Sequence, residues 1–158
     1  MRVPTLLKTG LAVAATAAVG AAATTPNAGW YRRLNKPSWQ PPAEAFGPVW
    51  TGLYALLAVA GARAIERVPR HERTPLIASY AINLGLNAGW TAAFFRARQP
   101  RLALAEIALL NASNIDLLAR MRRADGLSAA LTLPYAAWTG FATALNASIA
   151  RRNPMDEQ

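Results

Sequence analysis

The chain has 158 residues, of which 53% are hydrophobic and 16% charged, and 17 Lys and Arg against 8 Asp and Glu give it a net charge of +9. Because it has no cysteine, disulfide frameworks, thiolate nucleophiles and cysteine metal sites are excluded. The arginines lie at the ends of apolar blocks and not along one helix face, which argues against nucleic-acid binding and is typical of membrane helices flanked by lipid headgroups.

Five windows are long and apolar enough to cross a membrane as helices. A bilayer core of about 30 Å needs about 20 apolar residues of helix, and such windows lie near residues 5–24, 46–65, 75–95, 102–120 and 127–150. The longest connection between them covers residues 26–45. The sequence therefore predicts an all-α membrane protein with a single domain, residues 1–158, folded as a bundle of five transmembrane helices.

The first window, residues 5–24, has two interpretations. Its charged start, its alanine-rich run and its small residues near the end are also typical of a cleavable signal peptide. As a retained helix it would anchor the loop that follows. The Lys and Arg distribution does not orient the bundle, because nine lie on the side of the N-terminus and eight on the other side.

The loop of residues 26–45 combines aromatic, proline and cationic residues. Its prolines restrict φ and remove hydrogen-bond donors, so we expect an ordered lid without regular secondary structure that holds Trp30, Tyr31 and Trp39. The alternative is an aromatic belt at the membrane interface. Arg32, Arg33 and Lys36 are expected to contact either the carboxylates of a ligand or lipid headgroups.

Polar and aromatic side chains share faces within the second and third windows. Trp50 and Tyr54 lie one helical turn apart. In the third window, i, i+4 spacing places several such residues on one face: Ser79, Asn83, Asn87, Trp90 and Phe94. This face predicts either a hydrophobic pocket with polar groups or a strip of amides that joins helices. On a neighbouring face, Gly85 and Gly89 form a G-x-x-x-G motif that indicates close helix packing, as in a homodimer.

The fourth and fifth windows add carboxylates and a second aromatic face. Asp116 is expected to pair with Arg120, one turn further on, whereas Glu106 could reach the interface, face a pocket or be neutral. In the fifth window five residues fall within a sector of about 100°: Tyr135, Trp138, Ala142, Leu145 and Asn146. Small Ala142 beside Trp138 predicts room for a flat guest. His71, in a loop among arginines, indicates a solvated side chain, and no catalytic or metal motif accompanies it.

Four motifs in chain order resemble the TspO/MBR family, the tryptophan-rich sensory proteins that include the mitochondrial translocator protein, or peripheral benzodiazepine receptor. They are "WYRRLNKPSWQPP", "FGPVWTGLYALLAVAGA", "INLGLNAGWTAAFF" and "LPYAAWTGFATALNASIARRN", and together they extend from Trp30 to Asn153.

The resemblance implies a five-helix bundle, often dimeric, with a pocket open toward the first loop. It implies that this pocket binds porphyrins and synthetic benzodiazepine-type ligands and requires no cofactor or metal. The matching residues place Trp50 and Trp138 in the pocket, Trp30 and Trp39 in the lid, and six others around them: Tyr31, Pro41, Asn83, Asn87, Ala142 and Leu145. With Tyr54 and Trp90 from the shared faces, these form the predicted ligand site.

The function that follows is a tetrapyrrole-binding sensor or receptor in a membrane, and the cysteine-free, alanine- and arginine-rich composition suits a prokaryotic cell membrane. Two alternatives remain by resemblance: light-dependent porphyrin degradation with Trp50 or Trp138 as electron donor, and transport of porphyrins or lipids. Members associated with cholesterol have an aromatic pair in the last helix where this chain has Ala147 and Ser148. The sequence therefore argues against sterol transport.

Overall fold

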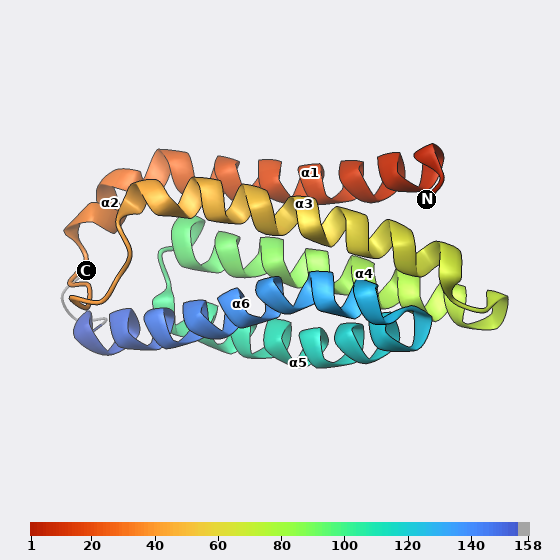
Figure 1. Cartoon of the computed structure of the whole chain (residues 1–158). Coiled ribbons are helices and arrows are strands. Elements are labelled where there is room, and N and C mark those ends of the chain that lie inside the picture. The colour runs from red at the N-terminus through yellow and green to blue at the C-terminus, as the bar shows by residue number, and fades with distance from the viewer. Residues whose placement is uncertain (155–158) are drawn as a thin grey trace.

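The structure, a computed structural model, describes residues 1–154, and within them the chain is helical without strands. Five long helices lie lengthwise beside one another (Figure 1): α1 (Val3–Thr24), α3 (Ala43–Arg67), α4 (Arg70–Thr91), α5 (Pro100–Ala124) and α6 (Gly126–Arg152). The all-α prediction is confirmed for this part of the chain. The last four residues of the predicted domain 1–158 lie outside it.

The helices overlap the five apolar windows but extend beyond them. The largest difference is in α4, which begins at Arg70 directly after Pro69, five residues before the window near 75. A hydrophobic window marks the part of a helix that suits lipid, whereas the helix itself continues into the charged interface. At its other end, α4 continues into a π-helical turn, Ala92–Arg96.

The lid differs from the prediction in its first third. Thr25–Asn27 form a 3₁₀ turn and Ala28–Arg33 form the short helix α2, so Trp30 and Tyr31 stand on a helix. The expectation of a lid without regular secondary structure is wrong for this segment, because its six residues contain no proline. Only residues 34–42, where the other lid prolines lie, are free of helix.

Each long helix packs against at least two of the others. α1 packs against α3 and α4, α5 packs against α4 and α6, and α6 also packs against α3. α1 is joined to α3 through the hydroxyl of Thr9, which donates to the carbonyl oxygen of Ala58 at 2.9 Å. With an odd number of long helices, the N-terminus of α1 and the C-terminal end of α6 lie at opposite ends of the bundle (Figure 1).

Three segments of the described chain are long and apolar enough to cross a membrane: Val3–Arg33, Ala43–Arg67 and Pro100–Ala124. Large apolar side chains point outward along the bundle, such as Leu11 at 69% exposure and Ile115 at 73%. An outer surface of this kind is typical of helices that face lipid.

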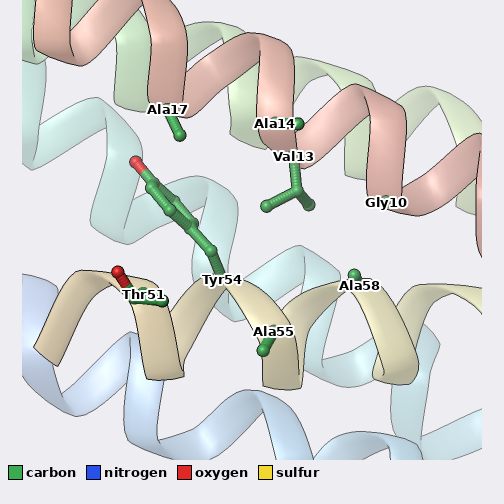
Figure 2. Close-up of a pocket in the computed structure, with 8 residues that line it drawn as sticks. All are labelled: Gly10, Val13, Ala14, Ala17, Thr51, Tyr54, Ala55 and Ala58. Atoms are coloured by element: carbon green, nitrogen blue, oxygen red, sulfur yellow. The ribbon is translucent and has the colours of Figure 1, made fainter. Parts of the chain in front are cut away.

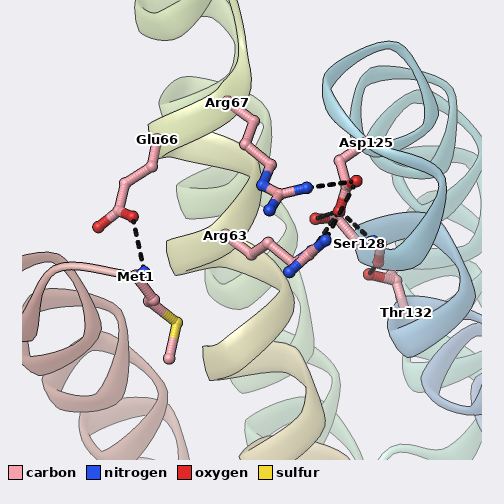
Figure 3. Close-up of polar contacts among 7 residues, drawn as sticks. All are labelled: Met1, Arg63, Glu66, Arg67, Asp125, Ser128 and Thr132. Carbon is pink, nitrogen blue, oxygen red and sulfur yellow. Dashed lines mark hydrogen bonds and ion pairs between the residues drawn. The ribbon is translucent and has the colours of Figure 1, made fainter.

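Asp125 ties the turn between α5 and α6 to α3 (Figure 3), and this turn lies at the end of the bundle opposite the lid (Figure 1). Its carboxylate accepts hydrogen bonds from the guanidinium groups of Arg63 and Arg67 and, at 3.1 Å, from the backbone N–H of Ser128. It therefore also caps the N-terminus of α6. The hydrogen bond from Arg63, together with those from Ser128, holds the pKa of Asp125 well below its ordinary value.

Candidate functional site

Nearly all aromatic side chains of the protein belong to one continuous set of ring contacts. The chain has 5 Trp, 4 Tyr and 4 Phe, and of these only Tyr80 lies outside it. We call this set the aromatic cluster, and its members are Trp30, Tyr31, Trp39, Phe46, Trp50, Tyr54, Trp90, Phe94, Phe95, Tyr135, Trp138 and Phe141.

Trp50 is the centre of the aromatic cluster because its indole meets rings from three helices. Its centroid lies 5.2 Å from that of Tyr54 on α3, 6.3 Å from Trp90 on α4 and 6.5 Å from Trp138 on α6. The planes of Trp50 and Trp138 are perpendicular, at 90°. Edge-to-face contact at these distances is favourable for aromatic pairs. The two tryptophans predicted to face the pocket are therefore direct neighbours.

Aromatic rings of the lid contact rings of the bundle at two places. On α2, Trp30 lies 5.9 Å from Phe94, and Tyr31 lies 5.3 Å from Phe95. Further along the lid, Trp39 lies 5.8 Å from Phe141 of α6. Rings of the lid thus rest on rings of the bundle at both ends of the segment.

Polar contacts hold the lid closed over these rings. The side chain of Asn153, at the end of α6, accepts from the backbone N–H of Asn35 at 2.9 Å and donates to its carbonyl oxygen at 3.0 Å. The hydroxyl of Tyr31 donates to Gln40 at 3.0 Å. The contacts between Asn35 and Asn153 join residues 118 positions apart in the chain.

The three cations of the lid have different surroundings. The ammonium of Lys36 donates to the carbonyl oxygens of Tyr31, Arg32 and Leu34 at 2.9 to 3.0 Å, so it caps the end of α2. Desolvation lowers its pKa. Lys36 is therefore occupied by the lid itself, whereas Arg32 and Arg33 are exposed.

The predicted amide face of α4 points into the bundle and joins helices there. Asn83 donates to Asn114 of α5 at 2.7 Å. Asn87 accepts from the hydroxyl of Tyr54 at 2.7 Å and donates to that of Tyr135 at 3.2 Å. Of the two interpretations from sequence, the strip of amides between helices is observed directly. It borders the aromatic cluster, because Tyr54 and Tyr135 belong to both.

Trp90 is fixed at the boundary between α4, α5 and α6. Its indole N–H donates to the side-chain oxygen of Asn146 at 3.1 Å, and Asn146 donates in turn to the carbonyl oxygen of Pro100 at 2.7 Å. Ala142 packs beside Trp90 in an apolar group that includes Ile107 of α5. Trp138 is half-buried and contacts the rings of Phe46, Trp50 and Phe141, and the room for a flat guest beside Ala142 stays a prediction.

The remaining predicted site residues lie at the lid end. Leu145 packs with Trp30 and Phe94. Pro41 is half-buried in the lid segment that leads to α3. The structure therefore brings the predicted tryptophans and tyrosines together directly. Asn83 contacts the aromatic cluster through Tyr135, whose hydroxyl donates to the side-chain oxygen of Asn83 at 3.0 Å.

Sequence reasoning missed Phe46 and Phe141, although both contact Trp138, with centroids at 5.9 Å and 5.2 Å. Helical spacing could have found them, because Phe46 precedes Trp50 by four residues and Phe141 follows Trp138 by three. It also missed Asn111 and Thr139, which extend the amide strip: the hydroxyl of Thr139 donates to Asn111 at 3.0 Å.

The two predicted carboxylates of α5, Asp116 and Glu106, both face α4. The predicted pair of Asp116 with Arg120 is confirmed at 2.8 Å, and the hydroxyl of Ser79 also donates to Asp116, at 2.6 Å. Glu106 is half-buried against Gly89, where an added Cβ would lie 2.6 Å from its carboxylate oxygen.

Two further predictions concern Gly85 and His71. In the single chain, Gly85 is exposed and Gly89 lies against Glu106, and packing through the G-x-x-x-G motif in a homodimer stays a prediction. His71 is solvated, with 80% of its side chain exposed. Residues 1–154 contain no group of three or more side chains suited to hold a metal ion.

A shallow apolar groove of about 310 Å³ runs between α1 and α3 on the outside of the bundle (Figure 2). Residues with small side chains form most of its walls, and Tyr54 projects across it toward α1. Its lining comprises Gly10, Val13, Ala14, Ala17, Thr51, Tyr54, Ala55 and Ala58. Since the Tyr54 hydroxyl binds Asn87, one side chain connects this outer groove to the amide strip.

Comparison with known proteins gives relatives over nearly the whole chain. Residues 9–152 match the TspO/MBR family. The chain is 34% identical to the tryptophan-rich protein TspO of Chlorobaculum tepidum over 94% of this chain and 98% of that one. It is 34% identical to a tryptophan-rich sensory protein of Cereibacter sphaeroides over 87% of each chain, and 32% identical to the human translocator protein over 78% and 75%. The protein whose tryptophans meet beneath the lid therefore belongs to the TspO/MBR family.

Proposed function

We propose that this protein is an integral membrane receptor or sensor that binds tetrapyrroles between its lid and its bundle, and that all five long helices span the bilayer. The helices have 22 to 27 residues, which is enough to cross a core of about 30 Å. α4 carries a large share of the polar residues, and its buried amides are satisfied by neighbouring helices, as the membrane interior requires.

The observation that carries the proposal is the aromatic cluster, which is continuous from the lid to the interior of the bundle. A tetrapyrrole is a flat π-system with carboxylates at one edge. It gains about 0.5–1.5 kcal/mol from each well-placed aromatic partner, and exposed Arg32 and Arg33 can receive the carboxylates at the lid. One of the relatives carries the word sensory in its name.

The rings contact one another, so a ligand must replace contacts between rings. We expect it to enter between Trp50 and Trp138, whose perpendicular planes then become two walls of the site. The lid must open for this step, which breaks the contacts between Asn35 and Asn153. Binding and lid movement are then coupled, as a sensor needs.

Titration of the purified protein with protoporphyrin IX tests the proposal through the shift of the ligand's own Soret band. We expect saturable binding to the parent protein and at least about a tenfold weaker affinity for Trp50→Ala, because this change removes contacts with rings from three helices. Because the Soret band belongs to the ligand, the measured affinity does not depend on tryptophan fluorescence, which the substitution itself reduces.

The matched control is Tyr80→Phe, which changes the one aromatic residue outside the aromatic cluster and removes only the hydroxyl that donates to Leu57 at 3.1 Å. Its affinity should equal that of the parent. Equal affinities in the parent and in Trp50→Ala would refute the proposed site, provided that both proteins keep their thermal transition.

A further inference from the structure

A second groove lies between α5 and α6, away from the aromatic cluster and at the end of the bundle opposite the lid. Its volume is about 690 Å³. It begins at the turn around Asp125 and runs along the outside of both helices. Its lining comprises Leu118, Ala119, Arg122, Arg123, Ala129 and Leu133.

The apolar wall of this groove belongs to the lipid-facing surface. Leu133 of α6 is 55% exposed. Ala119 of α5 is also exposed, and it belongs to the segment Pro100–Ala124, which is apolar enough to span a membrane. The alanines at positions 119 and 129 make the groove, because their side chains leave space between the larger leucines. An occupant therefore lies in the bilayer, along the helices.

The charged end of the groove is formed by Arg122 and Arg123, in the last turn of α5. Both are exposed, and neither forms an ion pair within residues 1–154. Three other arginines at this end do form ion pairs, whereas Arg70 and Arg73 form none within the described residues. Arg63 and Arg67 bind Asp125 (Figure 3), and Arg120 binds Asp116.

We propose that this groove binds an anionic phospholipid, with the phosphate between Arg122 and Arg123 and an acyl chain along Ala119 and Leu133. Arginine suits phosphate because its planar guanidinium can donate two parallel hydrogen bonds. Basic grooves between membrane helices at the headgroup level bind such lipids by the same combination of charge and apolar surface. None of the six lining residues is aromatic, so the groove lacks the stacking surface that a tetrapyrrole requires.

The assignment is independent of tetrapyrrole binding and is tested by native mass spectrometry. Protein is purified with a mixture of phosphatidylglycerol and phosphatidylcholine, and the lipids that stay bound are counted. We expect one phosphatidylglycerol to be retained preferentially. Arg122→Gln combined with Arg123→Gln should weaken its retention at least about tenfold, since two cations near the phosphate are lost.

The matched control is Arg151→Gln combined with Arg152→Gln, which removes an adjacent pair of exposed arginines from the end of α6 near the lid. It changes the net charge equally and should leave retention at the parent level. An equal loss in both double variants would show attraction by net charge alone and overturn the site. Undiminished retention in the Arg122 and Arg123 variant would overturn it as well.

The apolar part of the site is tested without a change in charge. Ala119→Phe fills the groove from an exposed position on α5, so the fold should remain intact, as the thermal transition will verify. We expect this variant to retain less phosphatidylglycerol than the parent. Displacement of the lipid by one equivalent of protoporphyrin IX would instead identify the groove as a tetrapyrrole site and refute the lipid assignment.

Discussion

Among the glycines of α3, Gly61 has the least space for a side chain. A Cβ added there would lie 2.8 Å from two ring carbons of Tyr80 on α4, well inside van der Waals contact. The ring has little freedom to withdraw, because its hydroxyl is held by the carbonyl oxygen of Leu57 at 3.1 Å. The absence of a side chain at Gly61 therefore sets how closely the two helices approach.

We expect Gly61→Ala to lower the free energy of unfolding by about 1–3 kcal/mol through overpacking. Gly52→Ala on the same helix is the control, since a Cβ there meets nothing within 4 Å and alanine favours helix. It should be neutral or stabilising. Thermal unfolding in detergent measures both, and a Gly61 variant as stable as the parent would contradict the close contact.

At the scale of elements, the turn between α5 and α6 is held to α3 by a single carboxylate. Asp125 accepts from Arg63 and Arg67 of α3 while it caps α6, so one side chain connects elements that are far apart in the sequence. Because these donors favour the charged form, the pKa of Asp125 is lower in the folded protein than in the unfolded chain. The stability that it contributes is complete above the unfolded value of about 4 and is lost as the pH falls further.

Asp125→Asn should therefore lower the thermal unfolding midpoint at pH 7. Below about pH 4, the midpoint of this variant should decline less than that of the parent. Glu44→Gln, which changes a carboxylate without an ion pair or side-chain hydrogen bond within the described residues, should follow the parent at every pH. The measurement is the thermal midpoint between pH 3 and 8, a range that includes the onset of the expected loss just below about pH 4. Parallel curves for Asp125→Asn and the parent would show that this carboxylate does not contribute.

At the scale of the whole molecule, one network of amides and hydroxyls connects four of the five long helices. It runs from Tyr54 on α3 to Asn87 on α4, and the hydroxyl of Tyr135 on α6 joins Asn87 to Asn83. Asn83 then donates to Asn114 on α5, which donates to Thr139 on α6 at 2.8 Å. Every buried side-chain nitrogen and oxygen of the described residues has a hydrogen-bond partner. A complete network of this kind favours one arrangement of the bundle over others.

Asn114→Ala removes the central member and leaves the amide of Asn83 and the hydroxyl of Thr139 short of a partner. We expect a loss of about 0.6–2 kcal/mol for each broken bond, measured by unfolding in mixed detergent micelles. Hydrogen exchange should also increase in α4, α5 and α6 together. Thr51→Ala is the control, since its exposed hydroxyl bonds only within α3, to Gly47. Faster exchange confined to α5 would argue against a shared network.

The sequence predicted the elements better than their contacts. The i, i+4 spacing of Asn83 and Asn87 identified the inward face of α4, and the family motifs placed Trp50 and Trp138 in one site. Lys36 shows one limit: its charge suggested contact with a ligand or with lipid headgroups, whereas its ammonium donates to carbonyl oxygens at the end of α2. Phe141 shows another: its spacing from Trp138 could indicate a shared face, but not that Trp39 of the lid also contacts it.

The positions of the five long helices, their apolar character and the family follow from the sequence alone, because they depend on local periodicity, on the length of apolar runs and on motifs. The tertiary structure decided that Asn83 pairs with Asn114 and that the aromatic rings contact one another beneath the lid. It also decided that, within residues 1–154, Arg122 and Arg123 form no ion pair while Arg63 and Arg67 bind Asp125. These features depend on which helices lie side by side. Each contact joins side chains whose distance in space bears no relation to their distance along the chain.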